Sequence, residues 1–101
     1  MNLIDYAGNV IRLTDERLTH IKEHPEMLPH ISKINETTAV PDTVIKSKSD
    51  EEARLYYKHY EGLSIGNKYL CIVVKFKGID AFVITAYFTD SIKKGDVIWK
   101  K

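Results

Sequence analysis

Two histidines and an arginine recur at helical spacing near the start of the chain. Arg17, His20 and His24 are separated by three and four residues, so a helix would present them on one side. Histidine acts as an acid or a base near neutral pH because its unperturbed pKa is about 6.5. Arginine grips two phosphate oxygens through its planar fork of donors. These residue types together favour chemistry on a phosphodiester.

Metal-free cleavage of RNA is the reaction that these groups suit. A base takes the proton of the 2′-hydroxyl, whose oxygen bonds to phosphorus, and an acid protonates the 5′-oxygen as its bond to phosphorus breaks. Cationic donors stabilise the charge that develops on the phosphoryl oxygens. We expect His20 and His24 to supply the acid and the base, with no metal and no cofactor.

Side chains that could complete such a site alternate along two expected strands. In the segment 53–60, Arg54, Tyr56 and Lys58 share one face, because alternate strand residues point the same way. In the segment 81–88, Thr85 and Tyr87 share one face. The opposite face is more uniformly apolar and is expected to pack against the helices: Phe82, Ile84, Ala86 and Phe88.

Thr85 and Tyr87 would then lie on the open face of the sheet. There they could join Arg54 and Lys58 if the two strands are neighbours, with Arg54 and Lys58 on the phosphate and Tyr56 stacked on a base. Structural alternatives stay open. The histidines could be ordinary surface residues, Arg54 and Lys58 the solvated face of a strand, and Tyr56 part of the core.

The charge of the chain is divided unevenly. Residues 1–53 carry six Lys and Arg against ten Asp and Glu, whereas residues 54–101 carry nine against four. An anionic ligand would favour the second half, and Lys94 is expected to contact phosphate there. Lysines 93, 94, 100 and 101 could equally be solubilising residues near a terminus.

The segment His20-Ile-Lys-Glu-His24 also matches the H-x-x-E-H pattern of one class of zinc peptidase. Pro25 follows at once, and such enzymes take a third ligand from a larger scaffold. We therefore expect no zinc chemistry.

Cysteine usage and hydropathy indicate the compartment. The single cysteine, Cys71, lies in an apolar run and is expected to be a buried, inert thiol. No window has the ~20 apolar residues of a membrane span, and the first 13 residues lack the layout of a signal peptide. These features predict a cytoplasmic protein without a membrane partner.

The elements that must position these residues follow in a simple order. The length of 101 residues predicts one domain. We expect a short hairpin in 1–13, a helical part in 14–40 and an antiparallel sheet in 43–100. Thr14 should cap the first helix and Pro25 should end it, while a second helix should begin at Pro29. The fold class is α+β, with N-terminal helices packed on one face of a four-stranded or slightly larger antiparallel sheet.

Several segments together resemble a known group of nucleases: residues 20–26, 54–58, 69–75, 82–89 and 92–99. The similarity is to small phage- and mobile-element-associated domains of the barnase–EndoU–colicin–RelE (BECR) superfamily. It spans about residues 12–100, and its most specific parts are His24-Pro-Glu26 and Ile84-Thr-Ala-Tyr87.

The resemblance implies a BECR-like fold and metal-independent RNA cleavage that leaves a 2′,3′-cyclic phosphate. Its pattern of a helix histidine, a strand arginine and a strand Thr/Tyr pair maps onto His20 or His24, Arg54, and Thr85 with Tyr87. It implies RNA, with tRNA among the candidates, as substrate, and a cognate antitoxin or immunity protein as inhibitor. The leading hypothesis is therefore a small toxin-like or phage-effector ribonuclease. The alternative is an inactive module of the same fold that binds RNA or a protein.

Overall fold

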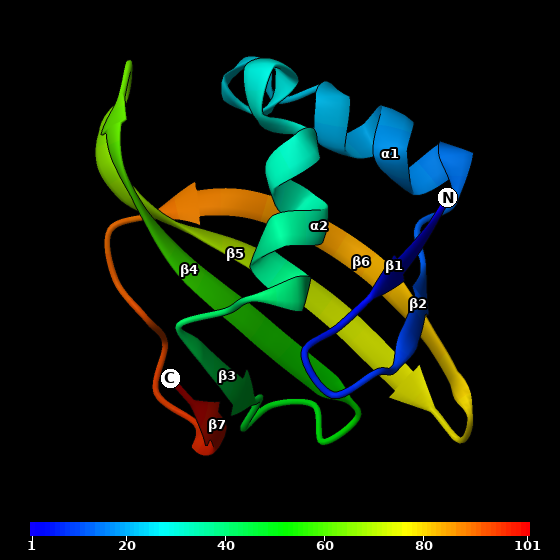
Figure 1. Cartoon of the computed structure of the whole chain (residues 1–101). Helices are drawn as coiled ribbons and strands as arrows, with labels where there is room; N and C mark the ends of the chain where they lie inside the picture. The colour runs from blue at the N-terminus through cyan, green and yellow to red at the C-terminus, as the bar shows by residue number, and fades with distance from the viewer.

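A single twisted sheet of seven strands organises the protein (Figure 1), and the computed structural model describes all of residues 1–101. The strands lie side by side in the order β1-β2-β6-β5-β4-β3-β7. Their bounds are β1 Asn2–Ile4, β2 Val10–Arg12, β3 Thr43–Lys46, β4 Ala53–Leu63, β5 Gly66–Lys77, β6 Asp80–Thr89 and β7 Asp96–Lys100.

The expectation of a BECR-like antiparallel sheet with four or slightly more strands is wrong. The N-terminal hairpin adds β1 and β2 to one side, where Arg12 pairs with Phe82 in parallel orientation, so the sheet is mixed. The short strand β3 joins β4 on the other side, and β7 adds to β3. Strands hold 48% of the residues and helices only 22%. Three-residue strands carry too little pattern to show from sequence which strand they will pair with.

The long hairpins of β4, β5 and β6 form the middle of the sheet. β4 and β5 pair along almost their whole length, as do β5 and β6. Branched and aromatic residues dominate these strands, which favours extended backbone. The turn at residues 78–79 contains Gly78 with a φ of 59°, a left-handed conformation that glycine adopts at little cost.

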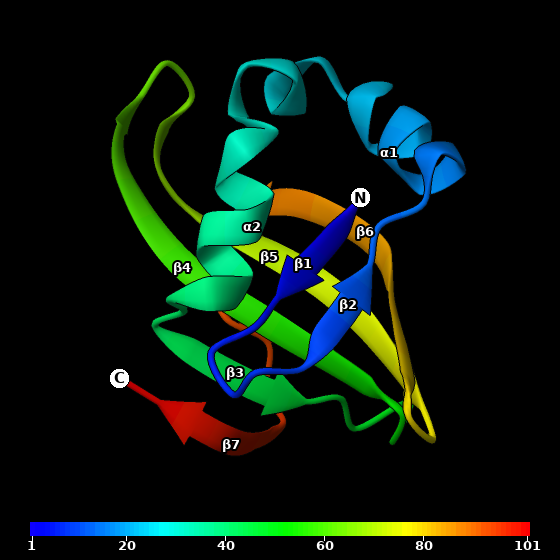
Figure 2. The same cartoon turned by 45° about the vertical axis from the view of Figure 1, so that its right-hand side comes forward.

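Three helices cover one face of the sheet (Figures 1 and 2). They are α1 (Asp15–Lys22), a 3₁₀ helix η1 (Pro25–His30) and α2 (Ser32–Ala39). The Thr14 hydroxyl accepts from the Arg17 N–H, which confirms the predicted cap. The second helix begins at Ser32 and not at Pro29. None of the three helices is long and apolar enough to cross a membrane.

The larger core lies between the helices and the sheet. Ile21 and Ile34 from the helices meet Leu70, Ile72 and Val74 of β5, all nearly inaccessible to solvent. A smaller apolar cluster lies on the opposite, uncovered face of the sheet and contains Ile45, Leu55, Tyr57 and Cys71. We call this side the open face.

An irregularity between β5 and β6 changes which side chains face the helices. Val74 pairs with Val83, but Val73 pairs with Thr85, so Ile84 is an extra residue in β6. Val83 consequently joins the larger core, whereas Ile84 lines a hollow on the open face. The expectation that Phe82 and Ile84 pack against the helices is wrong, because a bulge reverses strand parity. Ala86 and Phe88 do lie on the helix side, as expected.

Candidate functional site

The first strand group of the expected site belongs to the helix side of the sheet. Arg54 pairs with Val74 and shares its face, and its guanidinium lies 4.0 Å from the centre of the Phe76 ring. The Lys58 ammonium donates to the Val40 carbonyl at 3.0 Å. Tyr56 is fully buried, so it cannot stack on a base. These three residues therefore contact other parts of the helix side of the sheet: Arg54 contacts β5, Lys58 the end of α2, and Tyr56 the N-terminal hairpin.

Thr85 and Tyr87 lie on the other side of the same sheet. Tyr87 is directly across β5 from Tyr57, with Cys71 between them, and all three point to the open face. Cys71 is fully buried, as expected, and burial raises the pKa of its thiol to about 11. Burial also raises the pKa of Tyr57 to about 12 and raises that of Tyr87. These hydroxyls stay protonated at neutral pH and can only donate or accept hydrogen bonds.

The residues of the helix group do lie together. His20 and His24 are both exposed and their ring centres are 6.1 Å apart. His24 Nδ1 faces the Glu26 carboxylate at 3.8 Å. The shallow hollow beside His20 also contains Arg17, and every residue that lines it comes from α1 or the residue that follows. No group of three or more His, Cys, Asp or Glu is placed to hold a metal ion.

The structure therefore does not bring the expected strand residues into one site. Arg54 and Lys58 point toward the helices, whereas Thr85 and Tyr87 point away from them, and the sheet separates the two pairs. α1 packs against β6 and η1. The hollow beside His20 is not lined by Arg54. The expected neighbourhood fails because β5 lies between β4 and β6, and the bulge in β6 puts the two pairs on opposite faces.

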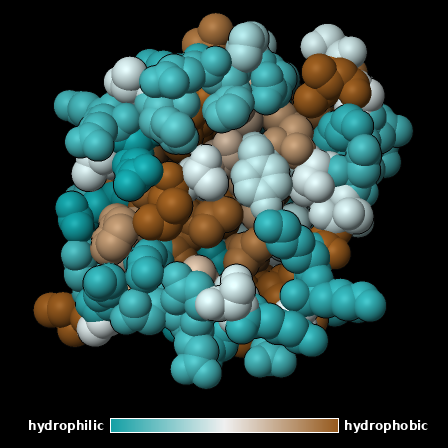
Figure 3. Space-filling view, turned by 180° about the vertical axis from the view of Figure 1, so that it is seen from behind, coloured by the Kyte–Doolittle hydropathy of each residue, from teal (hydrophilic) through white to brown (hydrophobic).

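A different set of residues converges on the open face. A hollow of about 440 Å³ has an apolar floor of Ile45, Leu55, Val73 and Ile84. Figure 3 shows this face, where hydrophobic residues gather in the middle and hydrophilic ones surround them. Only one carboxylate, that of Asp50, lines the hollow, whereas four lysines do: Lys48, Lys75, Lys93 and Lys94.

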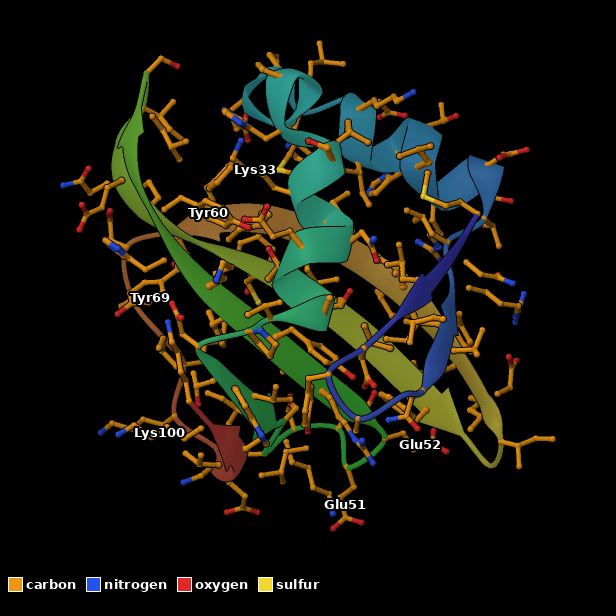
Figure 4. All side chains as sticks on the ribbon, viewed as in Figure 1. Lys33, Glu51, Glu52, Tyr60, Tyr69 and Lys100 are labelled. Atoms are coloured by element: carbon orange, nitrogen blue, oxygen red, sulfur yellow. The ribbon has the colours of Figure 1, made fainter.

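A second hollow of about 520 Å³ adjoins the first. Tyr69 and Lys100 line it, and both are labelled at the left of Figure 4. Lys93 and Lys94 line both hollows and form no ion pair. By contrast, Lys75 is paired with Asp50 at 3.1 Å. Lys48 in the first hollow and Lys100 in the second are also unpaired, but only Lys93 and Lys94 are unpaired lysines that line both hollows.

The loop that carries these lysines, Ser91–Gly95, is held close to the sheet. The Lys93 backbone N–H donates to the Tyr57 hydroxyl at 3.2 Å. Gly95 lies so close to β3 that a Cβ atom there would be 2.5 Å from Ile45 Cγ2 and 2.6 Å from the Lys46 carbonyl oxygen. Only glycine fits this approach without a shift of the loop or the strand.

Comparison with known proteins identifies no relative. No family model, no curated protein and no solved structure matches the chain. The chemistry of the open face must therefore be argued from its own residues.

Sequence reasoning found Lys94 but missed most of the open face. The sequence indicates Lys93 only as a basic residue near the C-terminus, indicates Tyr69 only as part of a strand, and predicts that Ile84 packs against the helices. The excess of basic residues in the second half was the available signal for Lys93. Nothing local could have placed Ile84, because its orientation depends on the bulge opposite Val73.

Proposed function

We propose that the protein binds single-stranded RNA on the open face of its sheet. The observation that carries the proposal is the pair of unpaired lysines, Lys93 and Lys94, held above a floor of apolar and aromatic side chains. Lysine ammonium groups attract the phosphate backbone. Exposed aromatic and aliphatic surface gives unstacked bases a place to pack.

The open face favours a single strand over a duplex. A duplex hides the faces of its bases in the stack and would offer this apolar floor only its backbone. Tyr69, which packs edge-on against the His59 ring at 4.9 Å, is partly exposed and supports base stacking. Tyr87, which is partly exposed, adds a hydroxyl that donates to RNA oxygens without a change of charge, since its pKa is raised.

The test is a fluorescence anisotropy titration with a labelled decamer of mixed RNA sequence. Lys93→Ala/Lys94→Ala should weaken binding and make the plot of log affinity against log salt shallower by about 0.7, which corresponds to one phosphate of a single strand that both lysines contact. The control is Lys22→Ala/Lys33→Ala, which removes the same charge on the helix side. No binding by the wild type at low salt, or an equal loss in both variants, would refute the proposal.

Metal-independent RNA cleavage is the second candidate, and one observation favours it. His20 on α1 and His24 just after it lie together, with Arg17 one turn before His20, so an acid, a base and a phosphate-binding cation share one surface. The resemblance to BECR nucleases supports the same chemistry, and a cognate antitoxin or immunity protein would then be the expected inhibitor.

Incubation of the protein with RNA in excess EDTA tests this candidate. Cleavage by these histidines would give products that end in a 2′,3′-cyclic phosphate. The His20→Ala/His24→Ala variant would not form them. Intact RNA at high protein concentration, under conditions where the decamer binds, would leave binding as the activity. Arg54→Ala is a useful comparison, because a guanidinium stacked over Phe76 and away from the histidines should not affect cleavage.

We also propose that the protein functions in the cytoplasm. The buried thiol of Cys71 and the absence of any other cysteine in this sequence suit a reducing compartment.

A further inference from the structure

The two hollows of the open face share a wall. Ile45, Lys93 and Lys94 line both of them, so the Ser91–Gly95 loop separates one hollow from the other. The floors differ in character. The first is aliphatic, with Val73 and Ile84, and the second has the aromatic ring of Tyr69.

The loop is positioned before any ligand arrives. The hydrogen bond from the Lys93 N–H to Tyr57 and the close approach of Gly95 to Ile45 fix both ends of the short lysine segment. A fixed loop loses little conformational freedom when it binds. The lysine charges are thus held at the boundary between two sites that each fall within the usual size range of small-ligand pockets, about 300–1,000 Å³.

We propose that the open face recognises one dinucleotide step of single-stranded RNA. The phosphate that links the two nucleosides binds Lys93 and Lys94, one base packs on Val73 and Ile84, and the other stacks on Tyr69. This inference rests on the proposed RNA binding and defines its smallest ligand. A phosphate that bears one nucleoside fills only one hollow, whereas a linked pair fills both.

The first experiment compares three small probes by nuclear magnetic resonance titration of the amide signals. The probes are ApA, AMP, and ApA with a neutral methylphosphonate linkage. AMP carries more negative charge than ApA, so an attraction based on charge alone would favour AMP. We expect ApA to bind about tenfold or more tightly than AMP, because of the second base, and the methylphosphonate to lose most of that affinity. The shifted signals should include Lys93, Val73 and Tyr69.

The second experiment moves the loop without a change of charge. Gly95→Ala should displace the loop from β3 and remove the preference for ApA over AMP. Lys93→Ala/Lys94→Ala should abolish ApA binding. A circular dichroism spectrum and a thermal melt verify that each variant folds. If Gly95→Ala does not fold, Tyr69→Ala replaces it. Tyr69→Ala should lose affinity for ApA but not for AMP.

The outcomes separate this inference from the proposal on which it rests. If the decamer binds but ApA binds no more tightly than AMP, or the neutral linkage binds equally well, the dinucleotide site is refuted and RNA binding stands. If neither the decamer nor ApA binds, both fail.

Discussion

Tyr56 donates a hydrogen bond of 2.6 Å to Asp5, a residue 51 positions earlier in the chain. Both residues are buried. The Asp5 carboxylate also accepts from the backbone N–H groups of Ala7 and Asn9 and from the Asn9 side chain. One carboxylate therefore closes the N-terminal hairpin turn and ties it to the central strand β4. The hydroxyl of Tyr56 stays protonated, because burial and Asp5 both raise its pKa.

Removal of that hydroxyl should destabilise the fold. Tyr56→Phe removes one of the two donors to Asp5 Oδ2 and leaves only the Asn9 side chain on that buried oxygen, while the ring still fills the core. We therefore expect a loss of about 1–3 kcal/mol in the free energy of unfolding. Urea denaturation followed by circular dichroism measures it. Tyr69→Phe is the matched control, since the Tyr69 hydroxyl makes no hydrogen bond within the protein, and equal stability of the two variants would contradict the assigned tie.

The bulge in β6 predicts opposite consequences for two adjacent residues. Val83→Ala should cost about 1–3 kcal/mol of stability because Val83 is in the core. Ile84→Ala should cost less, since Ile84 is partly exposed, but should weaken RNA binding by altering the floor of the first hollow. Thermal melts and the decamer titration measure both effects. A larger stability loss for Ile84→Ala than for Val83→Ala would contradict the bulge, because it would place Ile84 and not Val83 in the core.

His30 should make stability depend on pH. Its ring packs edge-on against Phe88 at 5.4 Å, and its Nδ1 is buried without a partner. Desolvation and Lys33 lower the pKa of His30 in the folded state. The unfolded chain therefore binds more protons, and stability should fall as the pH drops below about 6.5. In urea titrations at pH 7 and pH 5, His30→Gln should lose less stability than the wild type; an equal loss would assign the effect to other groups.

Cys71 should be unreactive in the folded protein. The thiol is fully buried and its pKa is raised to about 11, so little thiolate is present at pH 8. A thiol reagent such as Ellman's reagent should label it only in denaturant. Labelling of the native protein within minutes would show that the open face opens readily around Tyr57 and Tyr87.

Local sequence signals located most elements. Thr14 as a cap and Pro25 after α1 predicted the first helix. The expected strand segments 53–60 and 81–88 lie within β4 and β6. These features are encoded within a few residues of chain. The number of strands in the sheet and the parallel pairing of β2 with β6 were not predicted, because no local signal specifies the partner of a three-residue strand.

The sequence by itself determined where the first helix and the long strands lie, that Cys71 is buried, and that basic charge gathers in the second half. Only the tertiary structure decided which side chains meet. It separated Arg54 from Thr85 by placing them on opposite faces, and it brought Lys93 and Lys94 to the boundary of two hollows. The physical reason is that strand pairing and one bulged residue set the direction of every side chain beyond them, and these depend on contacts between distant parts of the chain.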